Sequence, residues 1–188
     1  MKALLYKQLR LVCHPMTPVF CMFGVMLMIP NYPLTVVWFY VMLGLFFTFL
    51  NIREQKDIYY SALLPVPKRD TVKAGCAFVV IIEVLSLAVL IPCSLLAVHL
   101  QPGKDNLVGL DPNLALLAAG FLLYAVFNAV FLPMHYKNGY DLGKPFLVCS
   151  ILEFVLIAVL ETLEHVLLAV LPQSAALLES YALHDQLR

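Results

Sequence analysis

The sequence predicts an all-α protein, a polytopic bundle of transmembrane helices with five spans. Hydrophobic residues make up 62% of the chain and charged residues only 13%. The mean hydropathy of +0.89 lies far above that of ordinary soluble domains. The apolar runs are continuous rather than alternating, which favours helices over a transmembrane β-barrel. At about 20 residues per span, the 188 residues hold little besides the membrane segments, so we expect one membrane domain, 1–188.

Residues 1–13 are predicted to form an amphipathic helix that lies in the membrane interface. The leucines of this segment gather on one side of a helical wheel, and Lys2, Lys7 and Arg10 gather on the other. Basic residues opposite leucines suit a helix at the surface of an anionic leaflet. The alternative is an ordinary lead-in to the first span.

Apolar runs predict the five spans, at 19–29, 34–50, 74–100, 113–134 and 146–171. The first run is short, so we expect it to tilt or to pack against neighbours. Trp38 and Tyr40 are near one end of the second span, where interfacial aromatic residues are expected. Pro92 predicts a kink in the third span. The tail, 172–188, is more polar and too short for a convincing sixth span.

The distribution of Lys and Arg predicts the orientation. With five spans, the N-terminus, the segment 51–73 and the loop 135–145 share one side of the membrane. That side holds Lys2, Lys7, Arg10, Arg53, Lys56, Lys68, Arg69, Lys73, Lys137 and Lys144. The other side holds only Lys104 and Arg188. This bias predicts a multi-pass plasma-membrane protein with a cytoplasmic N-terminus.

The segment 51–73 is the one long charged stretch in the chain, and it predicts a docking surface. Within it, 58–64 is long enough for about two helical turns, which Pro65 and Pro67 end. A short amphipathic helix held between two spans can pass force from a partner to those spans. The alternative is a solvated connector, which has no need of two adjacent tyrosines and two leucines.

Six polar residues within the spans are candidates for a translocation pathway or for locking helices together: Glu83, Asn128, Glu153, Glu161, Glu164 and His165. A charge at mid-membrane costs a few kcal/mol, so such residues usually face protein or water. The four in the fifth span fall within an arc of about 120°, so that face is predicted to point into the bundle or a dimer seam. A substrate or proton pathway, a structural network and a metal site all remain open.

Motifs for enzyme chemistry are missing from the sequence. It has no GxSxG, no HExxH and no glycine-rich phosphate loop, so we expect no catalytic residue, no metal site and no cofactor. The five cysteines form no CxxC pair and are interpreted as small core residues. The basic residues are few and lie at the membrane surface, which argues against nucleic-acid binding. The alternative to a docking protein is a membrane-embedded enzyme or a proton-coupled carrier. Either would use the stripe of Glu and His residues on the predicted face of the fifth span.

The opening MKALLYKQLRLV, the motif DIYYSALLPVPKRDTVKA at 57–74 and the order of the spans resemble the ABC type-2 permeases of bacteria. These are the membrane subunits of ABC exporters. The most specific part is LPV, a basic residue and then VKA, matched by Leu64, Pro65, Val66, Lys68, Arg69, Val72, Lys73 and Ala74. Members normally have six spans, so a sixth span is expected to be missing from this chain.

The resemblance implies a coupling helix between spans two and three, which contacts a separate ATPase subunit. The implied coupling residues are Asp57, Ile58, Tyr59, Tyr60, Leu63, Leu64, Pro65, Lys68 and Arg69. Of these, Asp57, Lys68 and Arg69 would form a charged rim around apolar anchors. The resemblance also implies dimerisation with itself or a related permease, and ATP and Mg on the ATPase. The expected function is export of a hydrophobic or amphipathic substrate, such as a peptide, an antibiotic or a lipid.

Overall fold

Helices make up all the secondary structure in the described part of the chain, in a computed structural model of 188 residues. The description leaves out residues 1, 30, 101–109, 111–113, 138–140 and 171–188. The helices are α1 (Lys2–Lys7), the π-helical η1 (Gln8–Val12), α2 (Met16–Cys21), the 3₁₀-helical η2 (Met22–Met28), α3 (Val36–Glu54), α4 (Asp57–Leu63), α5 (Lys68–Leu100), α6 (Leu114–Lys137) and α7 (Gly143–Val170). The predicted tail 172–188 lies outside the described residues.

Four helices, α3, α5, α6 and α7, are long and apolar enough to cross a membrane. A fifth crossing is counted only if the segments Lys2–Val12 and Met16–Met28, which meet at a bend of 90°, are taken as one broken span. The described residues therefore hold four to five candidate spans, against the five predicted for the chain. The sharp bend agrees with an N-terminal helix that lies across the direction of the segment after it.

The short segment α2–η2 gains length from its geometry. Its second half, η2, is a 3₁₀-helix of seven residues. A 3₁₀-helix rises about 2.0 Å per residue, against about 1.5 Å in an α-helix. Together α2 and η2 extend about 23 Å, which is still less than a hydrocarbon core of about 30 Å. This segment therefore depends on its neighbours, as its length predicts.

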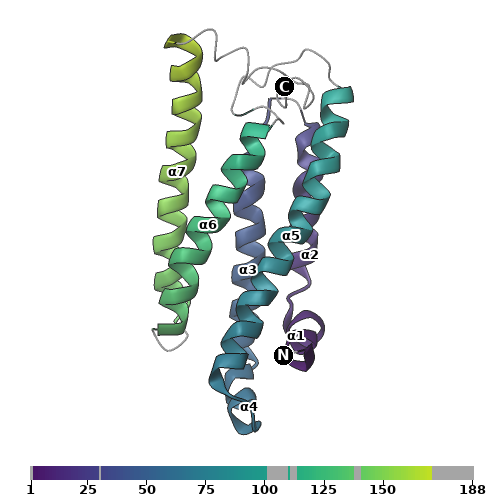
Figure 1. The fold of residues 1–188 in the computed structure, drawn as a ribbon, viewed down its shortest axis with the longest axis vertical. Helices are drawn as coiled ribbons and strands as arrows, with labels where there is room; N and C mark the ends of the chain where they lie inside the picture. Colours follow the sequence, from purple (N-terminus) through teal and green to yellow (C-terminus); the bar gives the residue numbers. More distant parts are fainter. Residues whose placement is uncertain (1, 30, 101–109, 111–113, 138–140, 171–188) are drawn as a thin grey trace.

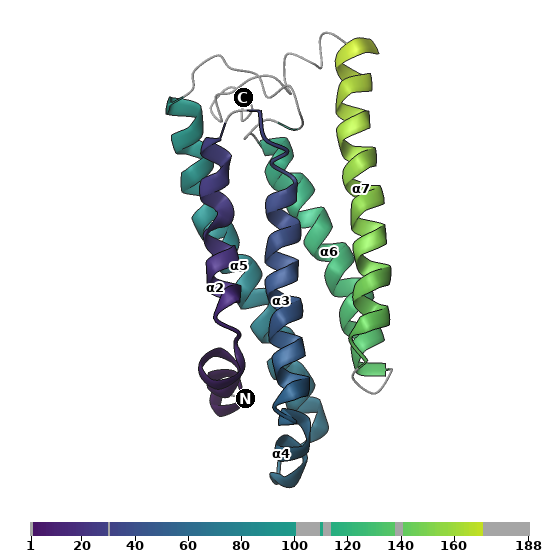
Figure 2. The ribbon, with the colours of Figure 1, turned by 180° about the vertical axis from the view of Figure 1, so that it is seen from behind.

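The long helices lie side by side in one bundle (Figures 1 and 2). In both views α2, α3, α5 and α6 lie together, and α7 stands at the edge beside α6. The segment α1–η1 and the helix α4 lie at the lower end, near the starts of α5 and α7 and the end of α6. We call this end of the bundle the basic end.

Close packing between α2 and α3 rests on small and hydroxyl-bearing residues. A side chain at Gly44 would meet Phe20 and the backbone of Thr17 at 3.1–3.2 Å, so glycine permits the approach. The Thr17 hydroxyl donates to the Gly44 carbonyl at 2.7 Å and lies 2.8 Å from the Thr48 hydroxyl. Small residues and hydroxyl hydrogen bonds hold helices together where the surrounding lipid is as apolar as the side chains.

Trp38 lies in the core rather than in the membrane interface. Its side chain is fully buried and packs edge-on against Tyr124, with ring centroids 5.3 Å apart. Any side chain at Gly120 would overlap the Trp38 ring, so α3 and α6 approach closely there. Trp38 is thus near the start of α3, as predicted, but its ring faces a neighbouring helix instead of lipid. Proximity to a span end in the sequence does not say whether a side chain faces lipid or a neighbouring helix.

The charged segment 51–73 is more helical than predicted. Helix α3 extends to Glu54, and α5 begins at Lys68 rather than at 74. Helix α5 also continues through Pro92. The helical hydrogen bonds of α3 and α5 continue past the ends of the apolar runs. The connection between these two helices is therefore only residues 55–67.

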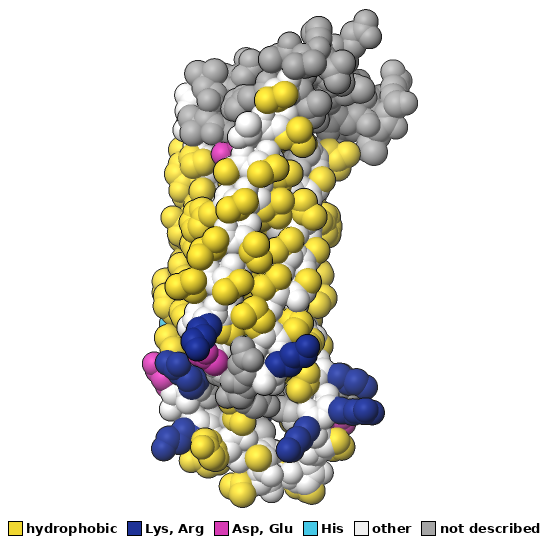
Figure 3. All heavy atoms as spheres, turned by 90° about the vertical axis from the view of Figure 1, so that its left-hand side faces the viewer, with side chains coloured by type: hydrophobic (Ala, Val, Ile, Leu, Met, Phe, Trp, Pro, Cys, Tyr) yellow, Lys and Arg dark blue, Asp and Glu magenta, His cyan; other side chains and the backbone are white. Residues whose placement is uncertain are grey.

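A band of apolar side chains runs along the bundle and ends in a belt of Lys and Arg side chains (Figure 3). The ten basic residues assigned to one side all lie at the basic end: Lys56 is in the turn before α4, and the others are on α1, η1, the end of α3, the starts of α5 and α7, and the end of α6. Lys104 and Arg188 lie outside the described residues. The predicted partition of charge therefore holds for the basic residues that the structure describes.

Candidate functional site

Helix α4 has two different faces at the tip of the basic end. Tyr59, Tyr60 and Leu63 have exposed fractions of 74%, 68% and 83%. Ser61 is buried, and Ile58 is half-buried and packs against the hydrophobic core. One face thus attaches the helix to the bundle, while the other presents two aromatic rings and a leucine.

Exposed residues continue the outer face beyond the end of α4. Leu64 is 49% exposed, and Pro65, Lys68 and Arg69 are also exposed. Of the predicted coupling residues, all are therefore exposed except Asp57 and Ile58. We call Tyr59, Tyr60, Leu63 and Leu64 the apolar tip.

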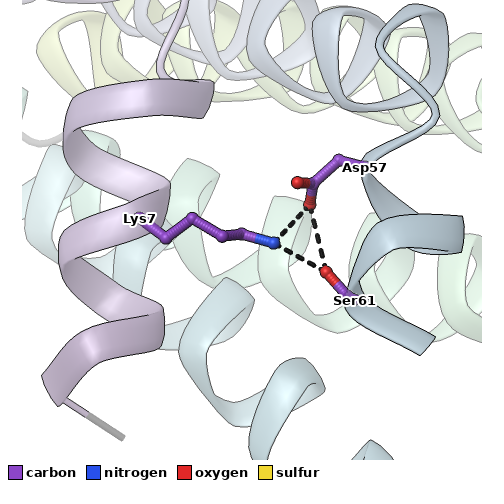
Figure 4. Close-up of polar contacts among 3 residues, drawn as sticks. All are labelled: Lys7, Asp57 and Ser61. Carbon is purple, nitrogen blue, oxygen red and sulfur yellow. Dashed lines mark hydrogen bonds and ion pairs between the residues drawn. The ribbon is translucent and has the colours of Figure 1, made fainter. Parts of the chain in front are cut away.

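Asp57 faces the bundle rather than the rim of the apolar tip (Figure 4). The Lys7 ammonium group donates to Asp57 Oδ2 at 2.8 Å and to the Ser61 hydroxyl at 2.6 Å. The side chains of Lys7 and Asp57 are only 19% and 15% exposed. The expectation that Asp57 joins a charged rim is therefore wrong, because Lys7 of the N-terminal helix holds its carboxylate.

Lys7 and Ser61 were not among the predicted site residues. The sequence marks Lys7 only as one of several basic residues on an amphipathic helix. It lies 50 residues from Asp57 along the chain, and no pattern in the sequence pairs them. The turn that leads into α4 also has an uncommon backbone, since Lys56 has a φ of 52°.

A cavity of about 570 Å³ lies behind α4. It is enclosed by η1, the end of α3, α4, the start of α5 and the end of α6. Its walls combine apolar side chains, such as Phe49 and Ile52, with polar ones, such as Gln8 and Asp57. The amide oxygen Oε1 of Gln8 is buried and has no hydrogen-bond partner in the described part of the chain.

Glu83 and Asn128 join α5 to α6 inside the apolar band. The Asn128 side-chain nitrogen donates to both carboxyl oxygens of Glu83, at 2.9 and 3.0 Å. Glu83 is buried. One turn away, the hydroxyl groups of Ser86 and Tyr124 make a second contact between the same two helices, at 2.5 Å.

The other polar residues of the predicted stripe have separate partners. Glu153 is buried and lies 3.1 Å from the thiol of Cys149, one turn earlier on its own helix. Glu161 accepts a hydrogen bond from the hydroxyl of Thr35, the residue just before α3, at 2.7 Å. The backbone of Glu164 and His165 belongs to α7, but their side chains lie outside the described part. The described carboxyl groups of the stripe therefore have different partners: Glu83 contacts α6, Glu153 contacts its own helix, and Glu161 contacts the start of α3.

Among the described residues, no group of three His, Cys, Asp or Glu side chains has the geometry of a metal site. The exposed apolar side chains of the basic end include those of the apolar tip, Tyr59, Tyr60, Leu63 and Leu64.

Comparison with known families identifies the chain. The family model described as "ABC-2 family transporter protein" matches residues 3–182, nearly the whole sequence. The chain belongs to the ABC-2 transporter family. Searches of curated proteins and of solved structures each gave no match.

The resemblance seen in the sequence is thereby confirmed. This ABC-2 family protein is a multi-pass membrane protein, and the family's membrane components are typically permeases without catalytic residues of their own. The family match does not by itself give a role to any residue of α4 or of the membrane-embedded pairs.

Proposed function

We propose that this chain is the permease subunit of an ABC exporter and that α4 is its docking helix for a separate ATPase subunit. The observation that carries the proposal is the exposure of the apolar tip. Two tyrosines and two leucines are exposed on α4 and directly after it, and α4 forms the lower tip of the basic end in Figure 1.

Aromatic and leucine side chains in this place need a partner. A lipid contact does not account for them, because they lie at the tip of the basic end rather than within the apolar band. Interfaces between proteins are enriched in aromatic residues at their centre and polar at their rim. Lys68 and Arg69 are exposed beside the apolar tip and supply such a rim.

The inner contacts of α4 give it two routes to the membrane helices. Lys7 connects it to the N-terminal helix through Asp57 and Ser61. The segment Pro65–Pro67 connects it to α5, whose first backbone bonds are accepted by the Pro67 carbonyl. A push on the apolar tip would reach both the N-terminal helix and α5.

The rest of the assembly follows from family membership and charge. The excess of Lys and Arg supports a cytoplasmic position for the basic end, in the plasma membrane of a bacterium. ATP and Mg would bind the ATPase, and the permease would pair with a second copy or a related permease. The apolar band suits a hydrophobic or amphipathic substrate, such as a peptide, an antibiotic or a lipid.

The test is co-purification with an ATPase encoded beside this gene. We expect the wild-type chain to retain the ATPase, and Tyr60→Ala and Leu63→Asp each to lower the retained amount at least tenfold, as hot-spot residues do. Tyr6→Ala is the matched control, because Tyr6 is an exposed tyrosine of the basic end that lies on α1. Equal losses in Tyr6→Ala and Tyr60→Ala, or full retention by both α4 variants, would contradict the proposal.

A further inference from the structure

The cavity behind α4 contains a buried acceptor that lacks a donor. The residue Gln8 is only 6% exposed, and its Oε1 has no hydrogen-bond partner among the residues that the structure describes. Leaving a buried polar atom unpaired is unfavourable, and native proteins seldom tolerate it. Gln8 lines the cavity, so a group bound there can supply the missing donor.

A second acceptor lines the same cavity. Asp57 uses its Oδ2 for both Lys7 and Ser61, which leaves Oδ1 without a partner among the described residues. A ligand with several N–H donors on one atom, such as a primary ammonium group, matches these two acceptors.

The cavity also has a cationic side and an apolar side. Lys68 lines it and makes no hydrogen bond or ion pair within the described part of the chain. Phe49, Ile52 and Val72 supply apolar walls. Its volume of about 570 Å³ falls in the usual range for small-ligand sites.

The position of the cavity indicates which kind of amine it would take. Its lining joins apolar side chains of the membrane helix α3, such as Phe49, to Lys68 at the start of α5, one of the basic residues of the basic end. Lipid headgroups lie at this boundary in a bilayer. A headgroup that carries an ammonium group and a phosphate places one charge near Asp57 and the other near Lys68.

We propose that this cavity binds the headgroup of an aminophospholipid, with its ammonium donating to Gln8 Oε1 and its phosphate near Lys68. The choline headgroup has the same charges but a quaternary nitrogen without N–H groups. It therefore cannot satisfy Gln8, and the site is expected to discriminate between the two lipids.

The experiment is native mass spectrometry of the purified full chain, titrated with phosphatidylethanolamine or phosphatidylcholine of the same acyl chains. We expect the wild type to bind the ethanolamine lipid about tenfold more tightly than the choline lipid. A tenfold difference in affinity corresponds to roughly one hydrogen bond to a group that is otherwise unpaired. Equal binding of the two lipids would overturn the proposal.

Variants test the role of Gln8. Gln8→Leu is expected to remove the preference for ethanolamine, and Gln8→Met, which keeps the unbranched shape, is expected to do the same. Gln55→Leu is the matched control, since Gln55 is exposed at the same end and bonds to Asn51 instead of lining the cavity. A preference that survives in both Gln8 variants, or that is also lost in Gln55→Leu, would contradict the assignment.

A competition experiment with soluble phosphoethanolamine distinguishes a lipid ligand from a soluble amine that has the same headgroup chemistry. No displacement of bound lipid at millimolar concentration supports a lipid occupant, whereas displacement shows that a soluble amine is the ligand and overturns the lipid assignment. Because the ATPase takes no part in these measurements, their outcome is independent of the proposed coupling function.

Discussion

Asp57, which is partly buried, and Glu83, which is buried, each join two helices through a carboxyl group, but they have different kinds of partner. Asp57, at the basic end, pairs with the cation of Lys7. Glu83, inside the apolar band, pairs with the neutral amide of Asn128. The difference follows from depth. Near the headgroups an ammonium group remains close to water, whereas within the bilayer each further charge costs a few kcal/mol.

The two contacts are therefore expected to differ in strength and in their response to salt. An amide supplies donors to a buried carboxyl group without adding a charge. A partly exposed ion pair contributes less to the free energy of unfolding, because water and salt screen the attraction between its charges. Substitutions at the two sites test this contrast.

The largest effect is expected from Asn128→Leu. The substitution leaves the buried carboxyl group of Glu83 without donors, which should lower the free energy of unfolding by about 3 kcal/mol. Titration with SDS in mixed micelles measures this loss. Ser86→Ala is the matched control on the same helix pair and should cost about 0.6 kcal/mol, the average for hydrogen bonds between membrane helices. Similar losses in both variants would show that Glu83 does not depend on Asn128.

The ion pair of Lys7 and Asp57 is expected to contribute less. A double-mutant cycle of Lys7→Met and Asp57→Asn should give a coupling energy of about 1 kcal/mol, the upper end for partly exposed pairs. The coupling should shrink by about half between 0.05 and 1 M salt because of screening. The effect of Asn128→Leu should stay constant over the same range. Lys2→Met, on the exposed side of the same helix, serves as the control. A coupling that salt leaves unchanged would place Lys7 and Asp57 in the same class as Glu83 and Asn128.

The smallest effect is expected for Thr35→Val. It removes the one hydrogen bond between Thr35 and Glu161 and keeps the shape of the side chain. Because Glu161 is only half-buried, water can replace the lost donor, and the loss should be about 0.5 kcal/mol or less. The same SDS titration measures it. A loss as large as that of Asn128→Leu would mean that exposure does not govern the strength of these contacts.

Much of the fold was predictable because lipid imposes simple requirements on a chain. Apolar runs of sufficient length predict helices, and these were found as α3, α5, α6 and α7. Proline residues ended the short helix near where they were expected, since α4 ends at Leu63, two residues before Pro65. The exposed side of α4 was predictable in part, because Tyr59 and Tyr60 are out of place in a solvated connector.

The partners of the polar residues were not predictable. Hydropathy does not distinguish a helix in the middle of the bundle from one at its edge, so it gave no sign that Trp38 faces Gly120 or that the polar residues of α7 have separate partners. The spacing of the polar residues along α7 predicts which of them share a face of that helix. It does not predict their hydrogen-bond partners, because these depend on which neighbouring helix lies opposite that face.

The sequence by itself determined the helical class, the apolar lengths, the basic end and the family, because each of these is a property of local composition. Only the tertiary structure decided that Asp57 turns inward to Lys7, that Glu83 meets Asn128, and that a cavity with the unpaired oxygen of Gln8 lies behind α4. These contacts join residues 45 or more positions apart. Their energies depend on distances between helices, and packing of the whole bundle sets those distances.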